Sequence, residues 1–301
     1  MTEPSPTPGI RAALNGAGEL ELTMVNAPAG AVIRMDVNAT SPRMLCTQGR
    51  YLAPVQAPPG TRIRFRLFHG KRGLTAPETF IMPGAPPAQP VPSTLIPCTQ
   101  NRDFMIYDWA ARHEAACRAV RKTHPDLLFI GDSITHFWGG EPKGPSVRGM
   151  ETWEKIMRPA GFHNLGYGFD RIENVLWRVY HGELDGYKAE EVVLMIGTNN
   201  IGINNDNEIV EGIRFLLSAI RQRQPEAKIK VIGILPRRNQ EERVRNLNLR
   251  IRQIAETGWY TFKNPGTKLL QEDGKINESL FSDGLHPNEE GYKQIVDEIA
   301  H

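Results

Sequence analysis

Short, mainly apolar runs that end at glycine or proline recur along the second half of this 301-residue chain, and they constrain its fold most. The runs cover residues 127–131, 191–196 and 229–235, and stretches with helical periodicity separate them. A short apolar run bounded by turn residues is typical of a strand buried on both faces, as in a parallel sheet. Such strands in alternation with helices predict an α/β domain with helices on both faces of the sheet.

The segments between these runs predict the other elements of the same domain. A last helix is expected to begin near residues 287–290, because Pro287 fits the start of a helix. The further strands are expected near 162–165 and 259–262, and the further helices over about 103–122, 171–182, 207–223 and 239–257.

The first third of the chain follows a different pattern. Apolar and polar residues alternate over 20–25, 32–37 and 62–68, and glycine, proline and asparagine bound these segments. Alternation with a period of two predicts strands that have one solvated face. We therefore predict a small antiparallel β domain, most simply a sandwich, that precedes the α/β domain.

The two domains are expected to cover residues 1–95 and 96–301. Residues 1–10 are predicted to form a loose tail, and the proline-rich stretch 83–97 a stiff linker. The β domain is either a carbohydrate-binding or substrate-shaping module or a structural appendage. The second interpretation is slightly favoured, because no row of exposed aromatic residues marks a sugar platform.

Composition excludes several classes of protein. A hydrophobic content of 40% and a charged content of 23% are ordinary for a globular protein. The net charge of +2, with no dense block of lysine and arginine, argues against a dedicated nucleic-acid surface. No run of apolar residues is long enough to predict a membrane-spanning helix.

The sequence carries no recognisable metal or cofactor motif. Cys46, Cys98 and Cys117 match no zinc or CxxC spacing; a Cys46–Cys98 bridge is conceivable, but free thiols are the default expectation. The phosphate-binding pattern GxxxxGK[ST] is absent, and Arg171 stands where a dinucleotide loop would need its third glycine. We expect neither a cofactor nor a metal.

A serine follows the first apolar run, in the sequence Gly131-Asp132-Ser133. Ligands of open parallel sheets bind beyond the carboxyl ends of the strands, so the Ser133 hydroxyl is expected at the mouth of that crevice. A helix cap is the competing interpretation, since serine is a good N-cap. As a nucleophile, Ser133 would need a base within hydrogen-bonding reach.

Asp283 and His286 are the best partners for that serine. They lie three residues apart in a tight turn, so the carboxylate could fix the imidazole tautomer while the other nitrogen takes the proton of Ser133. A lone surface histidine is the alternative interpretation of His286. Asn199 closely follows a second apolar run, which ends at Ile196, and its amide could stabilise a developing oxyanion by a few kcal/mol.

The sequence contains four short blocks in the order Gly131–Ser133, Asn164–Gly168, Gly197–Asn199 and Asp283–His286. Together they resemble the four sequence blocks of the GDSL, or SGNH, esterase superfamily. The similarity spans roughly residues 120–300 and is greatest to the branch that holds platelet-activating-factor acetylhydrolase-type enzymes and carbohydrate acetylesterases. The resemblance implies a flavodoxin-like α/β/α domain with a five-stranded parallel sheet. Two further runs, Asn174–Arg178 and Gly182–Leu184, are similar to that branch as well.

The resemblance implies a serine esterase with Ser133 as nucleophile, His286 as base and Asp283 as its orienting group. Its oxyanion hole would comprise the Ser133 N–H, an N–H near Gly168 or Phe169, and the Asn199 side chain. The family often has the sequence Gly-x-Gly-Gly-Asp, whereas residues 166–170 of this chain read Gly-Tyr-Gly-Phe-Asp. Phe169 therefore stands at the position where the family often has its third glycine. Any residue except proline can supply a backbone N–H donor there if its φ and ψ permit. The side chain of a phenylalanine at this position would also wall the acyl pocket and favour small acyl groups.

The resemblance suggests acetylated carbohydrate, such as xylan or its oligosaccharides, as substrate. Lipid-like or small aryl esters are the alternative, and a carbohydrate-binding protein with a relic site is a third. Trp138, Asp132 and Tyr167 are the candidate substrate contacts, although Asp132 is also expected to bond backbone amides of its turn. The visible N-terminus shows no signal peptide, so a cytoplasmic protein is expected; secretion would fit a polysaccharide substrate.

Overall fold

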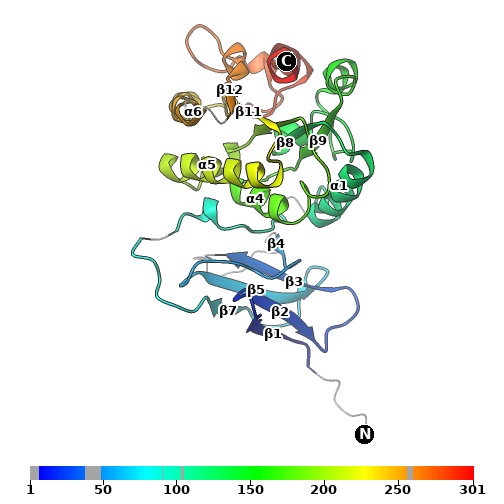
Figure 1. The fold of residues 1–301 in the computed structure, drawn as a ribbon, viewed down its shortest axis with the longest axis vertical. Coiled ribbons are helices and arrows are strands. Elements are labelled where there is room, and N and C mark those ends of the chain that lie inside the picture. Colours follow the sequence, from blue (N-terminus) through cyan, green and yellow to red (C-terminus); the bar gives the residue numbers. More distant parts are fainter. Residues whose placement is uncertain (1–6, 38–48, 90, 103–104, 256–259) are drawn as a thin grey trace. The chain divides into compact units, whose positions relative to one another are not determined.

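The structure is a computed structural model that describes residues 7–37, 49–89, 91–102, 105–255 and 260–301 (Figure 1). The chain divides into two compact units, Met1–Asp108 and Trp109–His301. This division lies later in the chain than the predicted boundary after residue 95.

The second unit is built on a five-stranded parallel sheet with the order β12-β11-β10-β8-β9. Numbered along the chain, this is the order 2-1-3-4-5 of flavodoxin-like sheets. The predicted fold class is therefore confirmed. The strands are β8 (Leu127–Gly131), β9 (Phe162–Gly166), β10 (Glu191–Met195), β11 (Lys228–Ile232) and β12 (Thr261–Lys263).

Helices cover both faces of this sheet, which explains why its central strands β8 and β10 are mainly apolar. On one face, Phe129 and Val193 join a buried cluster with Ile295 of the last helix. Their neighbours along each strand point to the opposite face and are buried as well. The helices are α1 (Trp109–Thr123), α2 (Ser133–His136), α3 (Met150–Thr152), α4 (Ile172–Tyr180), α5 (Asp206–Arg223), α6 (Glu241–Ala255) and α7 (Glu289–Ala300).

Two predicted boundaries in this unit were wrong. Helix α1 begins at Trp109 rather than near 103, because exposed Met105 and Ile106 offer no buried face to a helix. Strand β11 ends at Ile232, since the Asn248 side chain bonds both the N–H and the C=O of Ile234 at 2.9 Å. The last helix, α7, begins at Glu289, within the predicted start at 287–290, and Asn288 caps it by accepting a hydrogen bond from Gly291 N–H.

The first unit consists of small antiparallel sheets, as predicted. A two-stranded sheet and a larger sheet enclose a core that includes Leu20, Ile63 and Phe65. The expected loose tail is wrong from Gly9 onward, because that residue starts a strand paired with the next one. The strands are β1 (Gly9–Leu14), β2 (Leu20–Val25), β3 (Ala31–Val37), β4 (Gly49–Arg50), β5 (Arg62–His69), β6 (Arg72–Gly73) and β7 (Glu78–Ile81).

Two expectations concern features outside these sheets. Cys46, one half of the conceivable disulfide, lies outside the described residues. In the described part of the proline-rich stretch 83–97, residues Ser93–Leu95 form a short 3₁₀ turn. Among the helices in the described ranges, none has the length and apolar character needed to cross a membrane.

Candidate active site

Ser133 lies just beyond the carboxyl end of strand β8. Ser133 is the first residue of α2, and Asp132 caps that helix by accepting a hydrogen bond from Ile134 N–H at 2.9 Å. A Cβ atom at Gly131 would lie 2.7 Å from the Met195 carbonyl oxygen, so only glycine allows the turn to pass so close to β10. The Asp132 side chain thus holds the turn, as expected from the sequence.

Ser133, His286 and Asp283 form a continuous hydrogen-bonded chain. The Ser133 Oγ lies 2.8 Å from His286 Nε2, and His286 Nδ1 lies 2.8 Å from Asp283 Oδ2. The other carboxylate oxygen of Asp283 accepts the backbone N–H groups of Leu285 and His286. With a proton on Nδ1, the imidazole can accept the Ser133 proton at Nε2, which is the arrangement of a serine-hydrolase triad.

The electrostatics of the triad favour a neutral imidazole and an ionised carboxylate. Burial lowers the pKa of His286, Asp283 counteracts this, and Arg148 and Arg237 lower the pKa further. Burial would raise the pKa of Asp283, but hydrogen bonds from His286 and Arg148 outweigh it and hold the pKa below its usual range. His286 is therefore available as a base at neutral pH.

Arg148 is a residue of the site that sequence reasoning missed. Its Nη1 lies 3.1 Å from Asp283 Oδ2, and its guanidinium lies 5.4 Å from the centroid of the Phe137 ring. Phe137 in turn packs against the His286 ring, with 5.5 Å between centroids. Since Arg148 and Asp283 are 135 positions apart, no local spacing could have paired them.

Replacing Arg148 by alanine should shift the acid limb of the kcat/KM profile to higher pH, by roughly half a pH unit. Arg148 lowers the pKa of His286 directly and also competes with the imidazole for Asp283. Its loss therefore raises the pKa of His286, so protonation removes the base at a higher pH. The profile is measured on a short-chain ester, with the exposed Arg158→Ala as control. A limb that stays in place or moves to lower pH would contradict this assignment.

Asn199 is the side chain predicted to donate to an oxyanion. It follows β10 in a 3₁₀ turn, Thr198–Asn200, that Gly197 enters with a φ of 123°. One Nδ2 hydrogen of Asn199 is donated to the Asp170 carbonyl at 2.9 Å. This contact fixes the orientation of the amide and leaves the second hydrogen for a substrate oxygen.

The structure bears on the backbone donor predicted near Gly168 or Phe169. Gly168 N–H is engaged by His136 Nδ1 at 3.0 Å, so the prediction of Gly168 as oxyanion donor is wrong. Phe169 follows in the left-handed region with a φ of 63°, a conformation that is costly for a residue with a side chain. The backbone thus adopts at Phe169 the conformation for which the family often has glycine.

His136 is a second contributor that the sequence did not reveal. The side chain is buried, and burial together with nearby Arg112 and Arg178 lowers the pKa of its imidazole to about 2. A neutral His136 can accept the Gly168 N–H at Nδ1, which ties helix α2 to the loop after β9. His136 thus has a structural role beside the candidate active site.

The sequence profile of the GDSL-like lipase/acylhydrolase family matches residues 129–294, more than half of the chain, and includes every triad position. The chain belongs to this family. Platelet-activating factor acetylhydrolase IB subunit alpha2 of Bos taurus is 31% identical over 197 residues, which are 62% of this chain and 80% of that protein. Subunit alpha1 of Homo sapiens is 27% identical over 194 residues, 62% of this chain and 79% of that one.

A solved structure supports the fold of this GDSL-family chain. A GDSL-like lipase from Bacteroides thetaiotaomicron superposes with a TM-score of 0.51 at 18% identity, over 62% of this chain and 95% of that one. The confirmed resemblance and the parallel sheet place the chain in the SGNH superfamily as an ester hydrolase.

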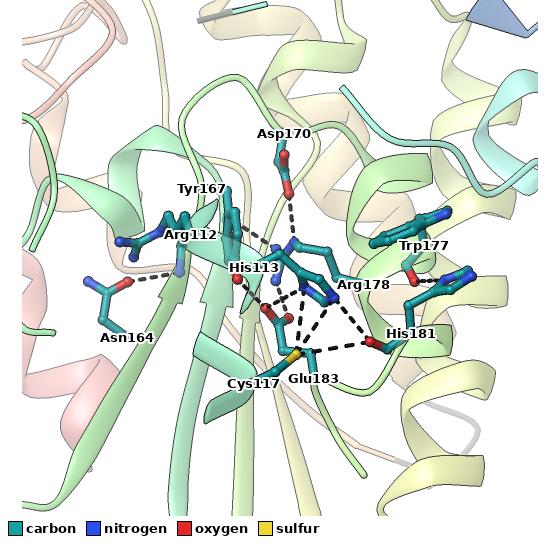
Figure 2. A network of polar contacts seen from close by, with 12 residues as sticks. Arg112, His113, Cys117, Asn164, Tyr167, Asp170, Trp177, Arg178, His181 and Glu183 are labelled. Atoms are coloured by element: carbon teal, nitrogen blue, oxygen red, sulfur yellow. Dashed lines mark hydrogen bonds and ion pairs between the residues drawn. The ribbon is translucent and has the colours of Figure 1, made fainter. Parts of the chain in front are cut away.

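The three candidate substrate contacts of this GDSL-family chain are wrong. Trp138 is fully buried, and its indole N–H is donated to Thr152 Oγ1 at 2.8 Å. Tyr167 is fully buried too, and its hydroxyl donates to Glu183 at 2.6 Å (Figure 2). Asp132 is buried as a helix cap, and burial, opposed by the Ile134 N–H, raises its pKa to about 7. Their polar atoms already have protein partners.

Proposed function

We propose that this protein is a serine esterase that removes short acyl groups, acetyl first, from carbohydrate esters such as acetylated xylan or its oligosaccharides. The observation that carries the proposal is the chain of two 2.8 Å contacts from Ser133 through His286 to Asp283. The acetyl preference is supported by the names of the relatives, which are acetylhydrolases.

In the proposed mechanism, Ser133 Oγ attacks the ester carbonyl carbon while His286 Nε2 takes the hydroxyl proton. The resulting oxyanion receives hydrogen bonds from the Ser133 and Phe169 amides and from Asn199. Collapse of the tetrahedral intermediate breaks the bond to the alcohol, which leaves with the proton from His286. Water then attacks the acyl-enzyme with the same base, releasing the acid and restoring Ser133.

The side chain of Phe169 is proposed to limit the length of the acyl group. It is 46% exposed and belongs to the residue whose amide is the proposed backbone donor. We expect Phe169→Gly to retain hydrolysis of p-nitrophenyl acetate within about tenfold, because glycine keeps the N–H and adopts a positive φ freely. The ratio of kcat/KM for octanoate over acetate should rise. An unchanged ratio would exclude Phe169 as the acyl limit.

The alternative is hydrolysis of lipid-like or small aryl esters by the same triad. The relatives named platelet-activating factor acetylhydrolase and the neighbour named a GDSL-like lipase favour it. A carbohydrate-binding role with a relic site has less support, because Ser133, His286 and Asp283 remain within hydrogen-bonding distance.

Parallel assays separate these functions. Acetate release from acetylated xylan is measured beside hydrolysis of p-nitrophenyl acetate and longer p-nitrophenyl esters, with Ser133→Ala as control. Acetate release from xylan together with a steep loss of activity beyond short acyl chains would support the carbohydrate esterase. Cleavage of aryl or long-chain esters alone would favour the lipid-like or aryl esterase. If the folded wild-type protein is not labelled by a serine-directed phosphonate, a carbohydrate-binding protein with a relic site would be favoured.

A further inference from the structure

One sequence motif has no part in the mechanism above. Asn174–Arg178 and Gly182–Leu184 carry an arginine and a glutamate, and in the structure both of these side chains are fully buried. Figure 2 shows Arg178 of helix α4 reaching towards Asp170 on one side and Glu183 on the other. Fully buried ions are costly unless paired, so this cluster calls for a physical account.

The first step of that account is the way Asp170 is held. Arg178 Nε donates to Asp170 Oδ2 at 2.9 Å, and the indole N–H of Trp109 donates to Oδ1 at 2.7 Å. Both carboxylate oxygens are thereby engaged in a site without solvent. Arg178 Nη1 also pairs with Glu183, so a single guanidinium is shared between two buried carboxylates.

The second step is that the backbone of Asp170 supports the oxyanion hole. Its carbonyl accepts the Nδ2 hydrogen of Asn199 at 2.9 Å, and its N–H is donated to the Tyr167 carbonyl at 3.1 Å. The second bond closes the turn that contains Gly168 and Phe169. Asp170 therefore positions the side-chain donor by its carbonyl and the backbone donor by its N–H.

The third step is that Arg178 also contacts Tyr167, where this turn begins, and the end of strand β8, which precedes the nucleophile. The guanidinium lies 3.8 Å from the centroid of the Tyr167 ring, whose hydroxyl donates to Glu183. Its Nη2 lies 3.5 Å from the Gly131 carbonyl, which also accepts the Tyr167 N–H. One side chain thus touches the strand end before Ser133 and the loop that faces it.

We propose that Arg178 is a positioning residue for the oxyanion hole. Through Asp170 it keeps the Asn199 amide and the Phe169 N–H at the spacing that the tetrahedral intermediate requires. The competing interpretation is general stabilisation of the fold, for which well-packed apolar side chains would serve as well or better than buried ions. The proposal deepens the proposed function and rests on it.

The test compares Arg178→Lys and Asp170→Asn with wild type on p-nitrophenyl acetate, at a temperature where circular dichroism shows each variant folded. Donors that act only on the oxyanion affect kcat more than KM. We expect kcat to fall about 10–100-fold with KM nearly unchanged, since loss of a whole oxyanion donor costs about 10²–10³-fold. The control is Arg223→Lys, because Arg223 pairs with Asp185 and lies over the Tyr180 ring.

A double-mutant cycle with Asn199→Ala distinguishes positioning from general stability. If Arg178 acts through the Asn199 amide, adding Arg178→Lys to Asn199→Ala should cost several-fold less in kcat than adding it to wild type. Full additivity, or a variant with lowered Tm and unchanged kcat, would overturn the proposal. Asp170→Asn keeps the side-chain volume, so the question can still be decided if Arg178→Lys does not fold.

Failure of the proposal can be told apart from failure of the proposed function. The endpoint of labelling by a serine-directed phosphonate counts the enzyme molecules with a reactive Ser133, so kcat can be expressed per labelled site. If Ser133→Ala retains wild-type activity, the proposed function itself fails. If Ser133→Ala is inactive while Arg178→Lys and Asp170→Asn match wild type per site, only the positioning role fails.

Discussion

Ser133→Ala is expected to lower kcat by about 10⁶-fold, the largest effect of any single substitution in this protein. The substitution removes the atom that forms the acyl-enzyme and leaves His286 Nε2 without the hydroxyl 2.8 Å away. A residual acceleration of about 10³–10⁴-fold over water should remain, because the oxyanion hole and substrate binding are still present. Turnover of p-nitrophenyl acetate under enzyme excess measures both quantities.

A matched substitution controls for loss of a serine hydroxyl elsewhere. Ser218 lies on helix α5, where its hydroxyl donates to the Arg214 carbonyl, and Ser218→Ala should retain wild-type kcat. KM for Ser133→Ala should stay close to that of wild type if substrate dissociation is fast relative to chemistry. A drop of less than about tenfold in kcat would show that another group is the nucleophile.

The sheet and the triad were predictable because they depend on local patterns. Strands covered on both faces are mainly apolar, so the runs at 127–131 and 192–196 show directly in the sequence. The carboxyl ends of parallel strands share one edge, which brings Ser133 and Asn199 to the same edge of the sheet. Asp283 and His286 meet within a single turn and need no knowledge of the fold.

Residues that act across the chain could not be predicted in this way. His136 accepts the hydrogen bond of Gly168 N–H, and Arg178 donates to Asp170 inside a buried network. No spacing in the sequence predicts these pairs. Trp138 was predicted as a substrate contact because it follows Ser133 closely. Closeness along the chain does not determine the direction of a side chain, and its indole points into the core towards Thr152.

Boundaries failed where side chains replace regular backbone pairing. The apolar run of β11 continues to residue 235, yet Asn248 takes over both backbone hydrogen bonds of Ile234 and ends the strand. At Phe169 the sequence raised the question of which backbone group serves the oxyanion hole. The proposal of Phe169 rests on its φ of 63° and on the hydrogen bond of Gly168 N–H, which only three-dimensional structure provides.

Asp283→Asn is expected to lower kcat by about 10⁴-fold while the fold is retained. An asparagine amide can donate to His286 Nδ1, and this favours the tautomer with its proton on Nε2. That proton would point at the Ser133 oxygen, so His286 could no longer accept the hydroxyl proton. Because Asp283 raises the pKa of His286, its neutralisation should also move any remaining acid limb of the kcat/KM profile to lower pH.

Asp273→Asn provides a control with closely similar local geometry. Asp273 also precedes a glycine in a turn, and its Oδ1 accepts the Lys275 N–H at 2.9 Å much as Asp283 Oδ1 accepts the Leu285 N–H at 3.1 Å. Only Asp283 adds a contact to an imidazole, so Asp273→Asn should keep wild-type kcat. If Asp283→Asn lost less than about tenfold in kcat, the 2.8 Å contact to His286 would have no part in orienting the base.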